Sequence, residues 1–245
     1  MRMRKKKYLA DRLEACAALC VGRLPSDPAK TADLALLRLS EIFGNENPLR
    51  LEIGCGKGQF AEEIARRNPA VNFIAVEQSP NVLVAAMERA KRAELTNLKF
   101  ISGTAEFLER LIPPKSVERI YLNFSCPFPK SSYAKHRLTH ARFLKIYRAL
   151  LSPGGYIVQK TDNAAFFEFS LNSFSDCGYR LRRISFDLHN SAIEGNIITE
   201  YEEKFSSKGF PIYYTEAFPL PDEKNPGNFE EKFPESSLQI PKNII

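Results

Sequence analysis

The stretch LEIGCGKG at residues 51–58 decides the fold of this chain. Its apolar start contains one acid and runs into glycines at every second position, and residues 59–67 then carry a helical pattern. This order predicts a buried strand, a tight loop and the start of a helix, because glycines there let the backbone approach a ligand closely. A dinucleotide-binding fingerprint would place its third glycine where Gln59 stands, so the loop fits a pyrophosphate poorly.

Further strands follow this loop in alternation with helices. Apolar runs at 71–76, 97–102, 117–124 and 156–160 are separated by helical patterns or by turn residues. Strands that alternate with helices in this way are typical of α/β proteins. The sequence therefore predicts a doubly wound, mostly parallel sheet with helices on both faces.

Candidate ligand contacts follow the ends of these runs. Glu77 comes 23 residues after Gly54, close to the spacing at which a carboxylate meets ribose hydroxyls in nucleotide-binding βαβ units. Thr104 and Cys126 follow the next two runs. Since ligands of such sheets bind at the carboxyl ends of the strands, these residues and the glycine loop predict one site for an adenosine-containing cofactor.

The composition bounds the class of protein. The 245 residues are 44% hydrophobic, which is enough for a globular domain with a substantial core. The net charge of +6 is compatible with a polyanionic partner. The 5 cysteines and 3 histidines show no metal-binding spacing, so we expect no metal site and reduced thiols in a cytoplasmic protein. No apolar run approaches ~18 residues, so we expect no membrane span.

The chain divides into three segments. Residues 1–25 are expected to form a basic arm and a short helix at 8–19, and the arm either contacts phosphates or is a solvated terminus. Residues 26–217 are expected to form the main domain. Residues 218–245 are a proline-rich tail, extended or docked on the domain. The sequence leaves open whether the protein is a monomer or a homodimer.

Capping residues predict two helix starts. Ser26 or Asp27, with Pro28 in the first turn, predicts a helix that runs to Gly44. Thr139 is the expected cap of a later helix, whose apolar face would point to the core.

Residues 130–148 are rich in cations. A polar helix face accounts for some of them, whereas their cluster at the lip of the predicted site, with Tyr133 among them, favours contact with an RNA backbone. The cationic residues are Lys130, Lys135, His136, Arg137, His140, Arg142, Lys145 and Arg148.

Several stretches of the chain occur together, in this order, in one family of enzymes. They are RMR at 2–4, LEIGCGKGQF at 51–60, YLNFSCPFPK at 121–130, TDN at 161–163, DLHN at 187–190 and EGNIITEYEEKF at 194–205. Together they resemble the bacterial tRNA (guanine-N7)-methyltransferases over residues 1–216. The resemblance implies a class I methyltransferase-type (Rossmann-like) fold with a seven-stranded sheet, S-adenosylmethionine (SAM) as methyl donor, and N7 of guanine 46 in the tRNA variable loop as the target.

The resemblance also implies roles for individual residues. Those at cofactor-binding positions are Glu52, Gly54, Gly56, Gly58, Glu77, Thr104 and Cys126. Those at positions that hold the substrate guanosine are Lys130, Asp162, Thr199, Glu200, Tyr201 and Glu202. The segment from Lys130 to Arg137 matches the RNA-contacting segment, with Lys135, His136 and Arg137 as its cations. The catalytic positions are occupied by Cys126 and Asp162.

Three of these positions depart from the family pattern. Cys126 stands where the family has an aspartate treated as catalytic, Phe128 replaces a tryptophan, and Thr104 replaces an acid. N7 of guanine carries a lone pair and no proton, so its attack on a methyl group requires alignment and no general base. We therefore expect activity to persist, with Asp162 and the carboxylates of residues 199–202 fixing the base.

Two other readings stay open. The chain could be a non-catalytic tRNA-binding relative that lost the aspartate. It could also methylate another nucleobase atom, since SCPF at 125–128 loosely resembles a motif of amine methyltransferases. A nicotinamide oxidoreductase is disfavoured by Gln59.

Overall fold

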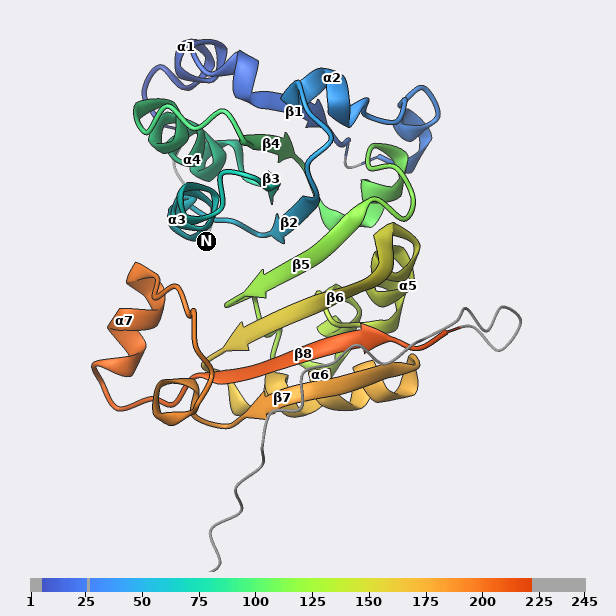
Figure 1. The fold of residues 1–245 in the computed structure, drawn as a ribbon, viewed down its shortest axis with the longest axis vertical. Coiled ribbons are helices and arrows are strands. Elements are labelled where there is room, and N and C mark those ends of the chain that lie inside the picture. The colour runs from blue at the N-terminus through green and yellow to red at the C-terminus, as the bar shows by residue number, and fades with distance from the viewer. Residues whose placement is uncertain (1–5, 26, 222–245) are drawn as a thin grey trace, which may run out of the picture.

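One sheet of eight strands runs through the part of the chain that the structure describes (Figure 1). This computed structural model describes residues 6–25 and 27–221, in which the strand order is β1-β4-β3-β2-β5-β6-β8-β7. The strands are β1 (Cys20–Arg23), β2 (Leu49–Ile53), β3 (Asn72–Glu77), β4 (Leu98–Ser102), β5 (Val117–Asn123), β6 (Leu151–Thr161), β7 (Tyr179–Ser185) and β8 (Tyr213–Pro219). The predicted doubly wound, mostly parallel sheet is confirmed.

The pairing of the strands places a ligand site next to β2. All neighbours from β1 to β6 pair in parallel, and β8 is antiparallel to both β6 and β7. The strand order reverses at β2, which lies between β3 and β5. Ligands of doubly wound sheets bind at such a switch point, beside the carboxyl ends of the strands.

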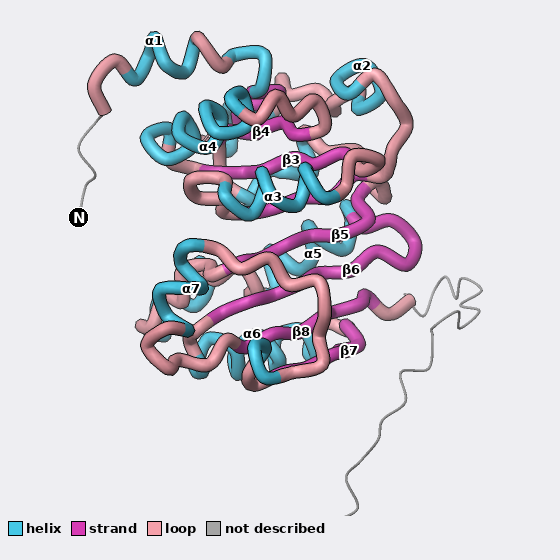
Figure 2. The backbone as a smooth tube through the Cα atoms, turned by 60° about the vertical axis from the view of Figure 1, so that its left-hand side comes forward, coloured by secondary structure: helices cyan, strands magenta, loops and turns pink. Residues whose placement is uncertain are grey.

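Helices cover both faces of this sheet (Figure 2). On one face lie α3 (Gln59–Arg67), α4 (Pro80–Arg92) and α7 (Glu200–Ser206), and α1 (Leu9–Glu14) packs against α4. On the other lie α2 (Leu39–Phe43), α5 (Ala141–Leu150) and α6 (Ala164–Asp176). The 3-10 turns are η1 (Ala17–Leu19), η2 (Pro28–Thr31), η3 (Ala105–Arg110), η4 (Ser131–His136) and η5 (Leu188–Asn190).

The central strands β3 and β5 send alternate side chains to two separate cores. In β5, Ile120 and Leu122 belong to the core beneath α5 and α6, whereas Tyr121 belongs to the core beneath α3 and α4. β3 alternates in the same way, with Ile74 in the first core and Phe73 in the second. Because side chains alternate with a period of two along a strand, Arg119 and Asn123 share the face of Tyr121.

The sheet has one strand more than the seven that the resemblance implied. The additional strand is β1, which pairs in parallel with β4 at the edge of the sheet. Its four residues include Gly22, where a Cβ atom would lie 2.7 Å from Leu111 Cδ1. The sequence did not predict this strand, because four residues are too few to show an alternating pattern of polar and apolar side chains. The strand also depends on the close contact of Gly22 with Leu111.

The segment before β2 is not the continuous helix that was predicted. It contains only η2 and α2, with extended chain between them in which Leu37 N donates to Leu111 O at 2.7 Å. Leu34, Leu37 and Phe43 still pack on the first core. The apolar residues therefore reach the core without helical geometry, since tertiary packing overrides a weak local preference.

The predicted cap at Thr139 is also wrong. The N-cap of α5 is His140, whose Nδ1 accepts from Arg142 N at 3.3 Å. Thr139 is buried, and its hydroxyl bonds to that of Ser170 at 2.8 Å. The predictions for residues 1–5 and 222–245 lie outside the described residues, whereas 218–219 belong to β8.

Candidate functional site

The glycine loop between β2 and α3 is held tightly against β3 and α4. Gly54 N and Cys55 N donate to Val76 O at 2.8 and 3.0 Å. Gly58 has a φ of 77°, and a Cβ atom there would lie 2.7 Å from Ala86 Cβ. At Gly54 an added Cβ would meet no heavy atom within 4 Å among the described residues. The loop is therefore packed on its inner side and open on the side where a ligand would approach.

Glu77 stands beside this loop at the end of β3. Its Oε2 accepts from Gly56 N at 3.2 Å and its Oε1 accepts from Ser79 N at 2.8 Å. Burial raises the pKa of Glu77, and the backbone hydrogen bonds from Ser79 and Gly56 oppose that rise. The carboxylate is thus fixed in orientation at the mouth of the loop.

Glu52, on β2, is more deeply buried than Glu77. It is 5% exposed, and Asn123 Nδ2 at the end of β5 donates to its Oε1 at 3.1 Å. Burial raises the pKa of Glu52 to about 7, although the hydrogen bond from Asn123 and the charge of Lys160 lower it. Glu52 Oε2 and Asn123 Oδ1 have no hydrogen-bond partner among the described residues. Both oxygen atoms are therefore acceptors that a donor group of a bound ligand would satisfy.

Two clefts meet at the glycine loop. The Glu77 cleft, of about 310 Å³, is lined by Glu77, Thr104, Ser125, Cys126 and Phe128 among others. The Glu52 cleft, of about 430 Å³, is lined by Glu52, Asn123, Thr199, Glu200 and Tyr201 among others. Gly54 and Phe124 line both clefts, so the two join at these residues.

The clefts contain unpartnered polar atoms that suit SAM. In the Glu77 cleft, Thr104 Oγ1 and Ser125 Oγ are buried without a partner among the described residues. In the Glu52 cleft the unpartnered atoms are the two acceptors of Glu52 and Asn123. Acceptors suit an ammonium group, and hydroxyls beside a carboxylate suit the polar edges of a nucleoside. The residues present therefore fit this cofactor.

Cys126 lies in the loop that joins the two clefts. Its side chain is exposed, and the neighbouring Phe124 and Phe128 have φ values of 50° and 41°. Arg137 fastens the loop, because its Nε and Nη2 donate to Pro127 O and Phe128 O, each at 3.0 Å. The hydrogen bonds from Arg137 thus stabilise the unusual backbone conformation around Cys126.

The predicted RNA-contacting residues follow this loop in the chain. Lys130 and Lys135 are exposed, and His136 lines the Glu77 cleft with its ring centroid 5.7 Å from that of Phe128. Arg137 is engaged by the loop carbonyls, and its guanidinium lies 4.3 Å from the ring centroid of Phe169. The lysines are therefore free to face a polyanion, whereas Arg137 stabilises the loop.

Residues 199–201 form the wall of the Glu52 cleft. Thr199 Oγ1 caps α7 by accepting from Glu202 N at 3.1 Å, and Gln59 Oε1 accepts from Glu200 N. The ring of Tyr201 lies 5.0 Å from that of Phe124. Gln59 thereby ties the start of α7 to the glycine loop.

Tyr201 also brings the two predicted catalytic residues together. Burial raises its pKa first, followed by the charge of Asp162, a hydrogen bond with Asp162 and the charge of Cys126. Asp162 follows β6 and Cys126 follows β5, so these strand ends and α7 converge on Tyr201. Tyr201 lines the Glu52 cleft and Cys126 lines the Glu77 cleft, and Tyr201 lies within electrostatic range of both Cys126 and Asp162.

Glu202 lies apart from this group. It is completely buried, and its carboxylate contacts Lys160 Nζ at 2.7 Å, His189 Nε2 at 2.8 Å and Asn196 Nδ2 at 2.6 Å. Burial raises its pKa, but the charge and hydrogen bond of Lys160 outweigh this and leave the pKa lowered. A carboxylate with these three partners holds the chain before α7 in place and does not face either cleft.

Four site residues were missed by the sequence reasoning. They are Gln59, Asn123, Ser125 and Lys160. Asn123 and Lys160 carried a usable signal, because each is a polar residue near the carboxyl end of a predicted parallel strand. Ser125 shared the strand-end signal of Cys126, whereas Gln59 carried none, since its role depends on α7.

The described part of the chain contains neither a metal-binding cluster nor a helix that could span a membrane. Within 6–25 and 27–221, no group of three or more His, Cys, Asp or Glu side chains could hold a metal ion. None of the helices in this part of the chain has the length and apolar character needed to cross a bilayer.

The sheet and the glycine-loop site define a class I SAM-dependent methyltransferase. Of the solved structures, the 16S rRNA methyltransferase KamB matches with a TM-score of 0.55 at 17% identity, over 77% of this chain and 99% of that one. A second, an antibiotic-related methyltransferase, also gives a TM-score of 0.55, at 16% identity over 76% and 96% of the two chains. At such identities these likenesses show the fold alone.

The particular family follows from closer relatives. A family model described as a putative methyltransferase matches residues 46–215. The tRNA (guanine-N(7)-)-methyltransferase of Listeria innocua is 46% identical over 217 residues, which are 89% of this chain and 98% of that protein. The enzyme of the same name from Bacillus subtilis is 44% identical over 88% of this chain and 98% of its own length. The chain belongs to the tRNA (guanine-N7)-methyltransferase family.

Proposed function

We propose that this protein transfers the methyl group of SAM to N7 of guanine 46 in the variable loop of tRNA. The observation that carries this proposal is the junction of the two clefts at Gly54 and Phe124. A cofactor that spans the junction has its adenosine in the Glu77 cleft and its methionine end in the Glu52 cleft. When bound in this way, SAM would supply a sulfonium methyl group for transfer, and Tyr201 lines the cleft through which a base would approach.

The cofactor is held by groups that the structure leaves ready for it. Glu77 would accept from the ribose hydroxyls, and Thr104 and Ser125 would bind the polar edge of the adenosine. Glu52 Oε2 and Asn123 Oδ1, which lack partners among the described residues, accept from the ammonium group. The backbone of Gly54, Gly56 and Gly58 gives close approach without side chains in the way.

The guanine is positioned by the residues around Tyr201. The ring of Tyr201 is tilted against that of Phe124 at 5.0 Å and stacks on that of Phe205 at 4.6 Å, and Asp162 interacts with the Tyr201 hydroxyl. Asp162 accepts from the amino and imino edge of the base, while Thr199, Glu200 and Lys130 bound the space for the nucleoside. N7 needs no proton removed, so alignment with the methyl group supplies about 7–11 kcal/mol of the barrier.

Cys126 and Glu202 have different tasks in this proposal. Cys126 lies at the rim, where its side chain contacts the reacting edge without accepting a proton. Glu202 is a positioning residue, because its ion pair with Lys160 fixes the chain that leads to Thr199. Lys135 and His136 lie beside the entrance and contact the tRNA backbone, and Arg137 keeps their loop in shape.

Methyl transfer to defined transcripts tests this proposal. Labelled SAM is incubated with unmodified tRNA and with a transcript in which guanine 46 is adenine, and the product nucleoside is identified. N7-methylguanosine formed only on the intact transcript is the expected result. A neutral methylated base would support action on another nucleobase atom, and tight binding without turnover would support a non-catalytic relative.

The setting of the protein follows from its substrate. Because tRNA is modified where it is made, we place the protein in the cytoplasm, as a monomer or a homodimer. Sedimentation with and without tRNA separates the two states, and a larger assembly would contradict both.

A further inference from the structure

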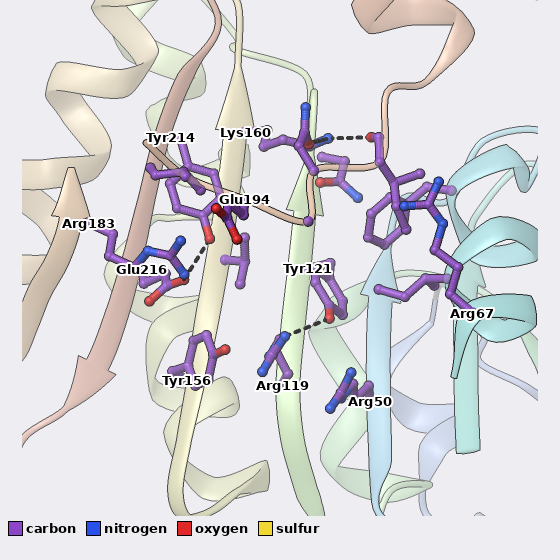
Figure 3. A pocket seen from close by; sticks show the side chains of 18 of the residues that line it. Arg50, Arg67, Arg119, Tyr121, Tyr156, Lys160, Arg183, Glu194, Tyr214 and Glu216 are labelled. Carbon is purple, nitrogen blue, oxygen red and sulfur yellow. Dashed lines mark hydrogen bonds and ion pairs between the residues drawn. The ribbon is translucent and has the colours of Figure 1, made fainter. Parts of the chain in front are cut away.

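A hollow distinct from the two clefts lies on the face of the sheet that carries α3. Figure 3 shows its floor, where Arg50 on β2, Arg119 on β5 and Tyr156 on β6 lie side by side. Arg67 of α3 stands at one wall, and residues 193–197 form the opposite wall. The hollow has a volume of about 300 Å³, and we call it the Arg119 groove.

The Arg119 groove is continuous with the Glu52 cleft. Asn123 and Phe60 line both spaces. Arg119 and Asn123 share one face of β5 and are four residues apart, which corresponds to about 13 Å along an extended strand. A polymer with one unit in the Glu52 cleft can therefore place a neighbouring unit in the groove.

The cations of the groove differ in how they are neutralised. Arg50 is paired with Glu118 at 2.8 Å, Arg67 with Glu63 at 2.7 Å, Lys160 with Glu202 at 2.7 Å and Arg183 with Glu216 at 3.1 Å. Arg119 has no carboxylate within ion-pair distance in the described part of the chain. Among these five cations, Arg119 is therefore the one without an ion-pair partner in the described residues.

Aromatic neighbours hold the Arg119 guanidinium in a fixed orientation. Its Cζ lies 4.4 Å from the ring centroid of Tyr156, and its Nη1 donates to Tyr121 Oη at 3.2 Å. Its Nε is buried and has no acceptor among the described residues. A preorganised guanidinium without an ion-pair partner is a fitting site for an anion, because bound oxygen atoms would balance its charge.

We propose that the Arg119 groove binds a backbone phosphodiester of the tRNA, close in sequence to the nucleotide whose base enters the Glu52 cleft. The fork of Arg119 takes the phosphate oxygens, and the exposed Glu194 on the opposite wall keeps the anion on the β5 side. Tyr156 supplies a ring beside it, as is common in single-strand binding sites. This inference rests on the proposed function, since it takes tRNA as the polymer.

The dependence of tRNA binding on salt tests the groove. Loss of one phosphate contact lowers the slope of log Kd against log salt by about 0.9, and we expect Arg119→Gln to show this together with a Kd about tenfold higher. Arg119→Lys should keep most of the slope, because it keeps the charge. The control is Arg38→Gln on the other face, whose side chain is 78% exposed and should change neither quantity.

Two further readouts separate the possible explanations. SAM affinity and methyl transfer at saturating tRNA should be unchanged in Arg119→Gln, which would exclude misfolding and binding of the cofactor's own carboxylate. A salt slope and Kd equal to those of the unaltered protein, in a variant that still binds SAM, would overturn the groove proposal. If the unaltered protein binds tRNA but transfers no methyl group, the proposed function is wrong. The slope of log Kd against log salt in Arg119→Gln still tests whether the Arg119 groove binds a phosphate.

Discussion

Asn123 donates to one oxygen of Glu52 at 3.1 Å and leaves the other oxygen of that carboxylate without a partner among the described residues. The contact joins the ends of β5 and β2, the two strands beside the switch point of the sheet. It fixes a buried carboxylate at the place where a methionine end would lie. The cost of burying Glu52 is visible in its pKa of about 7.

Glu52→Gln should stabilise the free protein at neutral pH and weaken SAM binding. Since burial raises the pKa of Glu52 from 4.5 to about 7, the folded state binds its proton more tightly than the unfolded state does. The contribution of Glu52 to stability is therefore largest below pH 4.5 and falls as the pH rises to 7, by at most about 3 kcal/mol. Urea unfolding of both proteins across this range measures the difference.

The pH profile distinguishes this effect from a general repacking. The gain of Glu52→Gln over the unaltered protein should grow between pH 4.5 and 7 and then stay constant. SAM affinity of the unaltered protein should increase over the same interval, because only the ionised carboxylate attracts an ammonium group. A gain that does not vary with pH would rule out titration of Glu52 as its cause.

The Lys160–Glu202 pair should be coupled far more strongly than a surface pair. Both side chains are nearly inaccessible, at 3% and 0% exposure, and their contact is 2.7 Å. Lys160→Met alone leaves a buried carboxylate without its main counter-charge, which should reduce the free energy of unfolding by about 3–5 kcal/mol. A double-mutant cycle with Glu202→Gln measures the coupling by urea unfolding.

Arg67 and Glu63 provide the matched control for this cycle. They also lie 2.7 Å apart, but their side chains are 51% and 32% exposed. Their coupling should not exceed about 1 kcal/mol. Equal coupling energies in the two cycles would mean that burial of Glu202 does not set the strength of its pair.

Local sequence signals predicted the parts of this site that depend on strand ends. Glu52 and Glu77 lie where the glycine spacing and apolar runs put them, because both signals come from neighbouring residues. The burial of Glu202 could not be predicted in this way, since its partners Lys160, His189 and Asn196 are brought together only by the folded chain. The short strand β1 escaped prediction for the same reason.

Gly58→Ala should destabilise the protein more than Gly44→Ala does. Both glycines have positive φ, 77° and 70°, so each substitution costs about 1–2 kcal/mol in backbone strain. At Gly58 the new methyl group would also lie 2.7 Å from Ala86 Cβ, whereas at Gly44 it meets no described heavy atom within 4 Å. Thermal unfolding should separate the variants, and SAM binding should fall only in Gly58→Ala. Equal decreases in the unfolding temperature of the two variants would show that α4 can move to accommodate the methyl group at position 58.

Asp162 should matter more than Cys126 for methyl transfer. Asp162 interacts with Tyr201, which lines the Glu52 cleft, whereas Cys126 is exposed at the rim. Loss of a charged hydrogen-bonding group from the base site costs about 1.5–3 kcal/mol, so Asp162→Asn should lower kcat/KM for tRNA about tenfold to a hundredfold. Cys126→Ala should remain within about threefold of the unaltered protein, because attack by N7 requires alignment and no base.

The exposed Asp176 at the end of α6 supplies the control for this comparison, and Asp176→Asn should leave kcat/KM unchanged. Steady-state methyl transfer with saturating SAM measures all three variants. An inactive Cys126→Ala beside a fully active Asp162→Asn would reverse the assignment and make the thiol the group that stabilises the charge developing on guanine. Activity that increases in Cys126→Asp would instead show that a carboxylate at this rim still aids the reaction, through attraction to the purine as it becomes cationic.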